Sequence, residues 1–462
     1  MHSATVLLAA LSAFSFSPVE SRAIEGRQNK GFTLQQVVYG KRLKNGPIAL
    51  GNLYKKVGVD MPTEVSEAFA VATESQAPAN VNKRAVPAKP KPSSTTTTSS
   101  TPSPTSTKAS STSSTIKSSS VASSSSKASS TQSGSAVATP VNQFDTAYMI
   151  PITLGGTTVM VDLDTGSSDL WAFSNLQPSS QTAGHNVYSP NPANVMPGYN
   201  WNVTYLDGSA ASGLVYKDTV GLGGMTFSNI PVEAAQSASS SFVTAAYDGM
   251  LGLAFDVLNT VRPVQQKTLF SNIMNQLPAK LFTSLLKHAA PGSYDFGYID
   301  SSKYTGAITY ATVDPSNGWW QFTSQGYSVG SGAAVQQSVP SVVDTGTTLM
   351  VMPSSIVSAY YAKVTNATYS TAYAAWIYPC TAALPNFNLL VNGAVATVPG
   401  SLMTYGPIDY IGNCYGGLQQ NDNIGIAILG DIFIKSQFIV YDQSTTPPRV
   451  GFAKQAGLSY TS

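Results

Sequence analysis

A short pattern that occurs twice constrains the fold of this 462-residue chain more than any other feature. Its copies, Met160–Ser168 and Pro340–Thr348, both run from apolar residues into Asp-Thr-Gly and a pair of hydroxyl residues. About 80 residues after each copy stands an apolar pair followed by glycine, at Met250–Gly252 and Ile428–Gly430. Paired elements in the same order and with similar spacing predict two homologous lobes.

From about residue 140 onward, the chain has the texture of β structure. Short runs of Val, Ile, Tyr, Phe and Thr alternate with Gly, Asn, Asp and Pro, which predicts strands joined by tight turns. Clear examples of such runs are 159–163, 200–205, 307–312 and 438–441. Only 268–286 and 354–363 show the apolar period expected of helices. We therefore expect an all-β fold with two lobes, 139–325 and 326–462.

The first part of the chain looks like a secretory leader followed by a processing region. The apolar run at 6–11 is too short to span a bilayer and predicts a signal peptide over 1–21, so we expect a secreted protein. Residues 22–84 are predicted to form a pro-segment, with helical patterning over 31–59. The basic pair Lys83–Arg84 is either a processing site or two charges in a linker.

A Ser/Thr-rich tract follows the predicted pro-segment. Residues 92–135 can bury too little apolar area to offset the entropy of ordering, so 85–138 is predicted to be a disordered, O-glycosylated linker. The mature chain would begin either after Arg84 or near Ser135, and the sequence leaves both possibilities open.

Charge is distributed unevenly along the chain. Residues 1–135 hold 15 Lys and Arg against 6 Asp and Glu, whereas 136–462 hold 10 against 17. This asymmetry indicates either attraction between a basic leader and an acidic body or a chance excess of basic processing sites. The basic residues form no compact patch with interleaved aromatics, so nucleic-acid binding is not expected. No later apolar run approaches 18 residues, so no membrane helix is expected either.

The two repeated motifs hold the candidate catalytic residues, Asp164 and Asp344. In each motif an apolar strand leads the aspartate into a tight turn, where a glycine permits close approach and unusual dihedrals. The next hydroxyl can orient the carboxylate by a hydrogen bond. These supporting residues are Gly166, Ser167, Gly346 and Thr347. Two carboxyls in contact would share one proton, so one can activate a water while the other polarises a carbonyl.

These motifs resemble those of the pepsin-like aspartic peptidases, especially the secreted fungal penicillopepsin- and aspergillopepsin-like type. The resemblance covers about 140–462 and rests on the sequences at 164–171, 344–348 and 428–431. It implies a bilobal fold with a central cleft and an endopeptidase that cleaves polypeptides at acid pH. It also implies a monomer without cofactor or metal that pepstatin-type inhibitors block. Thr165 and Thr345 would join the two turns by hydrogen bonds.

The resemblance also implies a flap, a hairpin over 201–213 that closes on the substrate. Tyr205 would hydrogen-bond Trp171, and Asp207–Gly208 would form the turn of the hairpin. Leu206 departs from the family, which commonly has glycine there, and this departure bears on specificity. Asp207 would favour Lys before the scissile bond, alongside a general preference for large apolar residues.

Further residues have roles that the resemblance implies or that short motifs indicate. Lys56 resembles the pro-segment lysine that blocks the aspartates, with Lys55 and Lys44 as alternatives, so the pro-segment would act as an internal inhibitor. Thr348 would contact the substrate.

Covalent modification is expected at four positions. Cys380 and Cys414 are the two cysteines of the chain and would form one disulfide. Asn202 and Asn366 stand in N-glycosylation sequons.

Rival functions are less well supported. A non-catalytic pepsin-fold binding protein would usually lack an aspartate of the dyad, its glycine or the flap tyrosine, and this chain retains all of them. A serine hydrolase would need a histidine base, and only His185 and His288 stand outside the signal region. A zinc peptidase would need His-Glu-x-x-His, which is absent. A mucin-like adhesive protein and a two-carboxylate glycosidase are further alternatives that fit the duplicated turns less well.

Overall fold

The computed structural model describes most of the chain beyond residue 45. The described residues are 46–56, 59–76, 131–205, 209–409 and 411–460. All of them belong to one compact unit, Leu43–Ser462. The predicted signal peptide and the candidates Lys44, Lys83, Arg84, Leu206, Asp207 and Gly208 lie outside the described residues.

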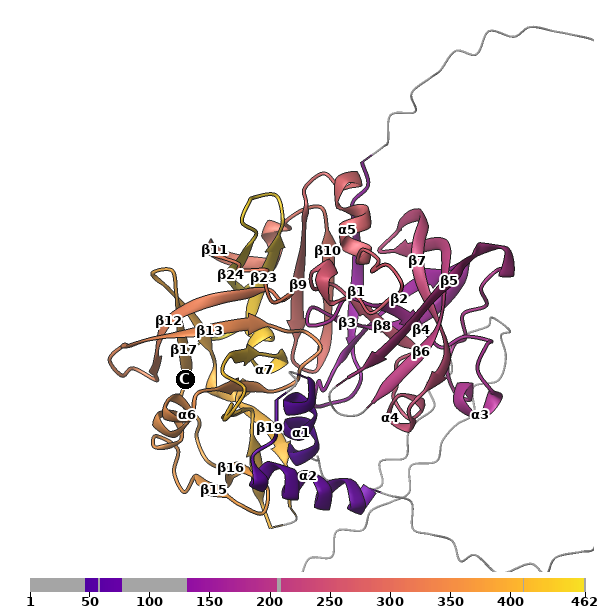
Figure 1. Ribbon diagram of the computed structural model, residues 1–462. Coiled ribbons are helices and arrows are strands. Elements are labelled where there is room, and N and C mark those ends of the chain that lie inside the picture. The colour runs from indigo at the N-terminus through magenta and orange to yellow at the C-terminus, as the bar shows by residue number, and fades with distance from the viewer. Residues whose placement is uncertain (1–45, 57–58, 77–130, 206–208, 410, 461–462) are drawn as a thin grey trace, which may run out of the picture. The chain divides into compact units, whose positions relative to one another are not determined.

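Strands dominate the described residues, and the largest sheet has 13 of them (Figure 1). Their order across the sheet is β11-β24-β23-β9-β10-β1-β2-β3-β8-β4-β7-β6-β5. The bounds are β1 (Gly134–Pro140), β2 (Tyr148–Leu154), β3 (Thr157–Asp164), β4 (Leu170–Ala172), β5 (Val195–Thr204), β6 (Ala210–Leu222), β7 (Met225–Ala238), β8 (Gly249–Gly252), β9 (Leu281–Lys287), β10 (Ala290–Phe296), β11 (Tyr304–Thr312), β23 (Gln437–Asp442) and β24 (Arg449–Gln455).

Two smaller sheets hold the other strands of the described chain. A seven-stranded sheet has the order β18-β17-β12-β13-β22-β14-β21, and a four-stranded sheet has the order β15-β16-β20-β19. The bounds are β12 (Gln321–Val329), β13 (Val335–Val343), β14 (Met350–Met352), β15 (Thr368–Ser370), β16 (Ala375–Pro379), β17 (Phe387–Val391), β18 (Ala394–Val398), β19 (Thr404–Pro407), β20 (Asn413–Gly416), β21 (Leu418–Gln420) and β22 (Ala427–Leu429).

Helices are short apart from the first two. The α-helices are α1 (Gly46–Lys56), α2 (Thr63–Gln76), α3 (Ser179–Thr182), α4 (Ser240–Val243), α5 (Leu269–Ile273), α6 (Ser354–Tyr361) and α7 (Asp431–Ile434). Single 3-10 turns are η1 (Pro192–Asn194), η2 (Asp256–Leu258), η3 (Met274–Gln276), η4 (Ser301–Lys303) and η5 (Gly400–Leu402). No helix of the described residues is long and apolar enough to cross a membrane.

The prediction of a helix over 268–286 is wrong for its second half. The expected helix at 354–363 is present as α6, but the one at 268–286 ends after η3 and continues as strand β9. Pro278 cannot continue a helix, because it lacks an N–H and its ring clashes with the preceding turn. The first six residues of β9, 281–286, are all buried. Periodicity alone cannot distinguish such a continuous apolar run from a buried helix.

The hairpin β2–β3 shows how the local sequence builds the first catalytic strand. Alternate residues of β2 are buried, with Tyr148 at one end and Leu154 at the other. Gly155 and Gly156 have φ values of 54° and 89°, which suit the two-residue turn that pairs Leu154 with Thr157. The hairpin therefore fixes which residues of β3 face the core on the way to Asp164.

The two sequence repeats occupy equivalent places in the two lobes. β3 pairs in parallel with β8, and β13 pairs in parallel with β22. In both cases the second strand is the apolar-apolar-Gly element, which also pairs antiparallel with the strand after the turn, β4 or β14. The prediction of an all-β fold with two repeated units is confirmed.

Two predicted segment boundaries, at 138 and 325, fall inside strands. β1 begins at Gly134, inside the predicted linker 85–138, because it pairs with β10. The predicted lobe boundary at 325 falls inside β12, and the chain passes from the first sheet to the second between β11 and β12. The last strands, β23 and β24, return to the first sheet, where they pair with β9 and β11.

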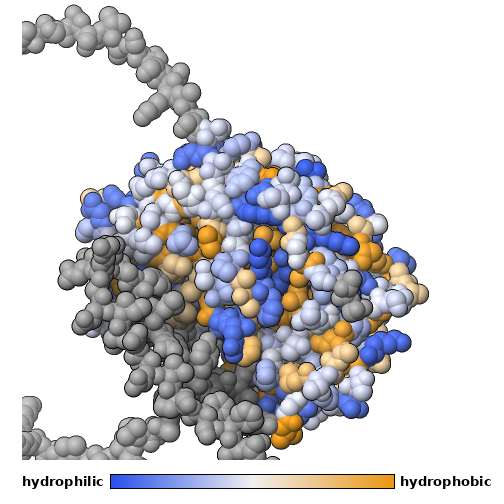
Figure 2. Space-filling view, turned by 180° about the vertical axis from the view of Figure 1, so that it is seen from behind, coloured by the Kyte–Doolittle hydropathy of each residue, from blue (hydrophilic) through white to orange (hydrophobic). Residues whose placement is uncertain are grey.

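Apolar side chains fill the interior, and no broad apolar surface appears on the face seen in Figure 2, where orange and blue residues are interspersed. The predicted disulfide is present between Cys380 and Cys414. It links the end of β16 to β20 beside the paired residues Pro379 and Asn413, and so reinforces the small sheet.

Candidate active site

The two candidate aspartates stand at equivalent strand ends. β3 ends at Asp164, and Asp344 follows directly after β13. Their exposed fractions are 1% and 3%. Each carboxyl is therefore almost completely withdrawn from bulk water. Electrostatic interactions are stronger in such a buried site than at the surface.

Threonines bind the two turns to each other with a symmetric set of hydrogen bonds. Thr165 N donates to Thr345 Oγ1 over 3.0 Å, and Thr345 N donates to Thr165 Oγ1 over the same distance. Thr165 Oγ1 donates onward to Val343 O at 2.9 Å, and Thr345 Oγ1 to Leu163 O at 2.6 Å. Both threonines are fully buried, so the turns are held together in a region without competing water.

The glycines of the two motifs act through their N–H groups. Gly166 N donates to Asp164 Oδ1 at 2.8 Å, and Gly346 N donates to Asp344 Oδ1 at 3.1 Å. Neither glycine is among the positive-φ residues of the described chain, so the expectation of unusual dihedrals is wrong. Each glycine N–H instead binds the carboxylate of the aspartate two residues before it.

The hydroxyls after the glycines have different partners in the two lobes. Thr347 Oγ1 donates to Asp344 Oδ2 at 2.5 Å, as expected of an orienting hydroxyl. Ser167 Oγ donates to Met250 Sδ at 3.6 Å. The pseudo-symmetry of the backbone thus does not extend to these side chains.

The apolar-apolar-Gly elements pack directly against the turns. A Cβ at Gly252 would lie 2.6 Å from Ser168 N, and a Cβ at Gly430 would lie 2.3 Å from Thr347 O. Real Cβ atoms do not approach that closely, so only glycine permits these contacts. This explains why the second half of the repeat ends in glycine in both lobes.

The predicted pair Tyr205 and Trp171 is brought together at the flap. Trp171 Nε1 donates to Tyr205 OH at 3.0 Å, and Tyr205 OH donates to Met250 Sδ at 2.9 Å. Burial, and after it the charges of Asp169 and Asp164, raise the pKa of Tyr205 well above its usual value of 10. The phenol is therefore a protonated hydrogen-bond donor over the whole working pH range.

We expect Tyr205→Phe to lower kcat/KM for peptide hydrolysis about tenfold. The variant leaves the buried indole N–H of Trp171 without its acceptor, which costs about 1–3 kcal/mol, and releases residue 205 from Trp171. Tyr199→Phe is the matched control, because Tyr199 lies on the same strand, β5, outside the cavity described below. Equal losses in both variants would contradict a specific role for Tyr205.

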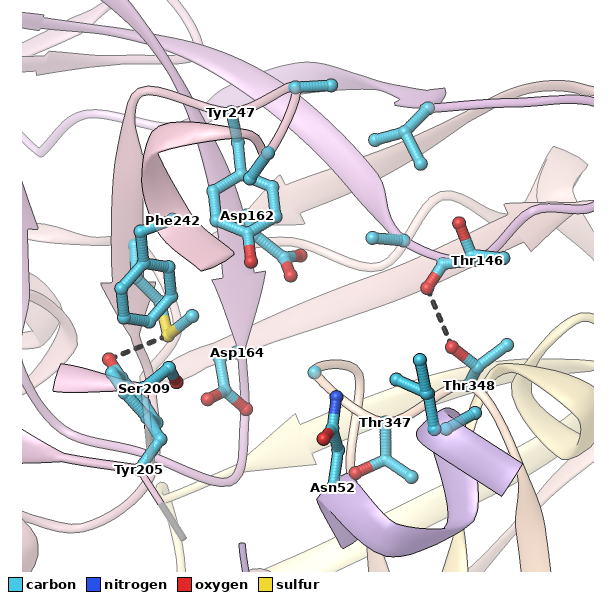
Figure 3. A pocket seen from close by; sticks show the side chains of 18 of the residues that line it. Asn52, Thr146, Asp162, Asp164, Tyr205, Ser209, Phe242, Tyr247, Thr347 and Thr348 are labelled. Carbon is cyan, nitrogen blue, oxygen red and sulfur yellow. Dashed lines mark hydrogen bonds between the residues drawn. The ribbon is translucent and has the colours of Figure 1, made fainter. Parts of the chain in front are cut away.

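One cavity of about 530 Å³ opens onto both turns and the flap (Figure 3). Its lining comes from the turns (Asp164, Gly346, Thr347, Thr348), the flap (Tyr205, Ser209), the wall after α4 (Phe242, Ala245, Ala246, Tyr247), the floor (Val141, Asn142, Thr146, Ala147, Asp162, Met250), Tyr405 and helix α1 (Ile48, Ala49, Asn52, Leu53). Thr348 Oγ1 donates to Thr146 O at 2.7 Å, so the predicted substrate residue Thr348 also ties the floor to the second turn.

Several lining residues were not among the predicted site residues. Asp162 is two residues before Asp164 on the same strand, and the period of two would have placed both on one side. Phe242 and Tyr247 belong to a wall that no motif marks. Asn52 enters from the predicted pro-segment, nearly 300 residues before Thr347 in the chain. Only long-range packing reveals the last three.

The two sequon residues lie away from the cavity. Asn202 on β5 and Asn366 after α6 are exposed, as glycan acceptors must be. Lys56 is the last residue of α1, and its side chain lies outside the described part. The ammonium of Lys55 lies 4.1 Å from the ring centre of Phe69 in α2.

A buried pair of carboxyls stands behind Trp171. Asp169 and Glu233 are 1% and 2% exposed, and Asn259 Nδ2 donates to Asp169 Oδ1 at 2.9 Å and to Glu233 Oε1 at 3.1 Å. Burial, followed by the charge of Asp169, raises the pKa of Glu233 well above its usual range. Burial also raises the pKa of Asp169, against hydrogen bonds from Thr260 that lower it. Burial therefore favours the protonated form of this pair.

Other hydrolytic centres find no support in the described residues. The sequence Gly326–Gly330 has the Gly-x-Ser-x-Gly spelling, but it runs along β12, and Ser328 Oγ accepts from Asn388 Nδ2 at 3.1 Å. A serine-hydrolase nucleophile would stand on a strand-to-helix turn. No group of three His, Cys, Asp or Glu side chains is placed to hold a metal within the described ranges.

Two β lobes whose Asp-Thr-Gly turns are joined by threonines and open to a single cavity define the class of aspartic peptidases. Residues 147–455 match the family model described as eukaryotic aspartyl protease. The chain belongs to this family, and it is a pepsin-like aspartic endopeptidase of the fungal type.

Several named fungal proteases are similar to this chain. Penicillopepsin-3 of Penicillium janthinellum is 49% identical over 322 residues, covering 69% of this chain and 81% of the relative. Aspergillopepsin-1 of Aspergillus fumigatus is 48% identical over 326 residues, covering 70% and 82%. Aspergillopepsin-1 of Aspergillus oryzae is 39% identical over 455 residues, covering 98% and 99%, so this similarity extends through the leader.

Proposed function

We propose that the protein is a secreted endopeptidase that hydrolyses polypeptides at acid pH with Asp164 and Asp344 and is made as a zymogen. The observation that carries the proposal is the threonine-bonded pair of turns, which lines one cavity with Asp164 from the first turn and with Gly346 and Thr347, the residues that follow Asp344, from the second. A monomer suffices, because both aspartates come from one chain.

The chemistry requires one proton on the pair of carboxyls. The ionised aspartate accepts a proton from a water, whose oxygen forms a bond to the carbonyl carbon of the peptide. The protonated aspartate donates its proton to the carbonyl oxygen, which gives a neutral tetrahedral diol. The carboxyl that received the proton of the water passes it to the amide nitrogen as the C–N bond breaks. The other carboxylate takes a proton from a hydroxyl of the diol as the C=O bond re-forms, so the pair again shares one proton. The reaction therefore requires acid pH, because at higher pH both carboxyls ionise and no protonated aspartate remains to act as the acid.

The cavity lining supports a preference for large apolar substrate residues. Phe242, Tyr247 and Met250 surround the space beside Tyr205, and burial of an aromatic or aliphatic side chain there is favourable. Tyr205 packs edge-on against Phe242 with ring centres 5.4 Å apart, so closing the flap completes this wall.

A preference for Lys before the scissile bond is proposed for Asp207. We expect Asp207→Ser to lower kcat/KM for a peptide with Lys at that position about threefold to fivefold, the size of one exposed charge pair. Cleavage of the matched norleucine peptide should change little, since it has no charge to pair. Equal rates for the Lys peptide with and without the substitution would remove Asp207 from the specificity account.

Helix α1 supports the zymogen part of the proposal. Leu50, Leu53 and Tyr54 are 0%, 3% and 0% exposed, in a cluster with Tyr405 and Tyr415 of the second lobe. The same helix contributes Asn52 and three apolar residues to the cavity lining, where a substrate would lie. The pro-segment thus acts as an internal inhibitor, with Lys56 as a further candidate contact, and protonation of body carboxylates at acid pH would weaken its hold.

Processing and secretion complete the proposal. The residues just before β1 contact the catalytic unit, since Gln132 N donates to Gln276 O at 2.9 Å. A mature start after Lys83–Arg84 would leave a flexible glycosylated arm, and a start near Ser135 would remove the Ser/Thr tract. The disulfide and the exposed sequon residues Asn202 and Asn366 suit an extracellular protein.

The test is hydrolysis of denatured globin by the secreted, acid-treated protein with class-specific inhibitors. Hydrolysis at acid pH that pepstatin abolishes, and that a serine reagent and a metal chelator leave intact, is the expected result. Hydrolysis that survives pepstatin would overturn the proposal. Tight pepstatin binding without hydrolysis would favour the non-catalytic binding protein.

A further inference from the structure

His185 occupies a buried site behind the wall of the substrate cavity. Its side chain is 3% exposed, and its ring stacks on Phe173 with ring centres 4.0 Å apart and planes 10° from parallel. Nδ1 lies 3.3 Å from Asp248 Oδ1, and Nε2 lies 3.1 Å from Val243 O. Both ring nitrogens therefore face oxygens.

The partners of the ring dictate its protonation. A backbone carbonyl only accepts, so Nε2 must carry a hydrogen to bond Val243 O. Asp248 acts as an acceptor for other groups as well, with Asn186 N at 2.9 Å on Oδ1 and Met160 N at 2.8 Å on Oδ2. A bare Nδ1 lone pair would repel this carboxylate. Only the imidazolium, which donates from both nitrogens, satisfies both contacts.

The two partners belong to elements that build the cavity. Val243 ends α4, directly after Phe242, and the chain from there to Tyr247 forms the cavity wall. Asp248 precedes β8, and its bond from Met160 N connects it to β3, which ends at Asp164. His185 is therefore a link between this wall and the strands that carry the first catalytic turn.

We propose that His185, as a buried imidazolium, is a positioning residue that holds the Phe242–Tyr247 wall against β3 and β8, and that loss of its proton loosens the wall. The inference rests on the proposed function in so far as this wall receives substrate. It adds a second, neutral-pH limit to substrate binding that is independent of the aspartates.

The surroundings of the ring agree with this assignment. The titratable groups that face it are Asp248 and Tyr247; Phe173, Asn186 and Val243 contribute none. Burial alone would lower the pKa of His185, but the hydrogen bonds to Asp248 and then to Val243 O outweigh it and raise the pKa above 6.5. A raised histidine pKa gives stabilisation that is complete below about 6.5 and is lost as pH rises through the folded-state value. The wall is thus braced throughout the acid range.

The experiment compares His185→Gln with His288→Gln in the secreted, acid-treated protein. His288 is the other histidine of the described residues, and its side chain is 54% exposed, away from the cavity lining. We expect His185→Gln to raise KM about tenfold for a peptide with a large apolar residue before the scissile bond, the effect of losing one charge-assisted hydrogen bond, with kcat changed far less. Because turnover is confined to acid pH, the pH dependence is read from the dissociation constant of a non-cleavable peptide with the same apolar residue. In the wild type and in His288→Gln this constant should be low in acid and rise above neutrality, whereas in His185→Gln it should be high throughout.

Ring protonation is read separately, by NMR of the ¹⁵N-histidine-labelled wild type, with the two variants used for assignment. The proposal expects both nitrogens of His185 to carry hydrogen at pH 6. A neutral ring at pH 6, or equal KM values for the two variants, would overturn it. The NMR reading needs no turnover, so an inactive enzyme would count against the proposed function and leave the histidine assignment testable.

Discussion

Replacing Asp164 by Asn should lower kcat for peptide hydrolysis by about a thousandfold or more, and Asp344→Asn should do the same. An amide neither accepts the proton of the water nor shares one with the remaining aspartate. Asparagine is nearly isosteric and keeps an oxygen for the N–H of Gly166 or Gly346, so the turns should remain intact. The measurement is hydrolysis of one peptide at acid pH, with the melting temperature checked for each variant.

Asp314→Asn is the matched control, because Asp314 is an exposed aspartate outside the cavity lining. It should leave hydrolysis unchanged. The two dyad variants should also lose no more together than either alone, since both aspartates act on one proton. Activity within tenfold of wild type in either single variant would show that another group activates the water.

Glu233→Gln should flatten the loss of stability that the wild type shows as pH rises. Burial raises the pKa values of Asp169 and Glu233, so the folded state favours the neutral form. A raised carboxyl pKa gives stabilisation that is complete below the ordinary value near 4 and is lost as pH rises through the folded-state value. Glutamine presents the same shape with an N–H₂ in place of the second oxygen, which mimics the protonated acid.

The measurement is the free energy of unfolding of wild type and variant between pH 4 and 8. We expect the two curves to lie close together near pH 4 and to separate toward pH 8, with the variant more stable at neutral pH. Asp300→Asn serves as control, because the pKa of this exposed carboxyl is lowered by its bonds to Ser302, the opposite direction. A variant that follows the wild-type curve up to pH 8 would place the pH-sensitive group elsewhere.

The sequence reveals the parts of the site that local pattern determines. Asp164 and Asp344 could be predicted because strand, turn and glycine are contiguous in each copy, and the repetition itself marks them. Strand runs such as those of β3 and β23 were recognised for the same reason. The helix expected over 281–286 was wrong because burial on both faces of a sheet removes the alternation that identifies a strand.

The remaining features depend on contacts between distant segments. Asn52 reaches the cavity only because α1 packs against Tyr405 and Tyr415 of the second lobe. The return of β23 and β24 to the first sheet is a topological choice that no local run encodes. The sequence marks His185 only as one of two histidines that could serve as a base, and its bracing position is visible only once Val243 and Asp248 are placed on its two nitrogens.

The pH dependence of kcat/KM for one peptide, measured on the acid-processed enzyme, tests most directly whether two carboxyls sharing one proton carry the reaction. The account predicts a bell whose two limbs both lie in the acid range, because the acid limb reports loss of the carboxylate base and the other limb loss of the shared proton. A profile that instead rises to a plateau at neutral or alkaline pH would contradict it, since that shape belongs to a single base of higher pKa.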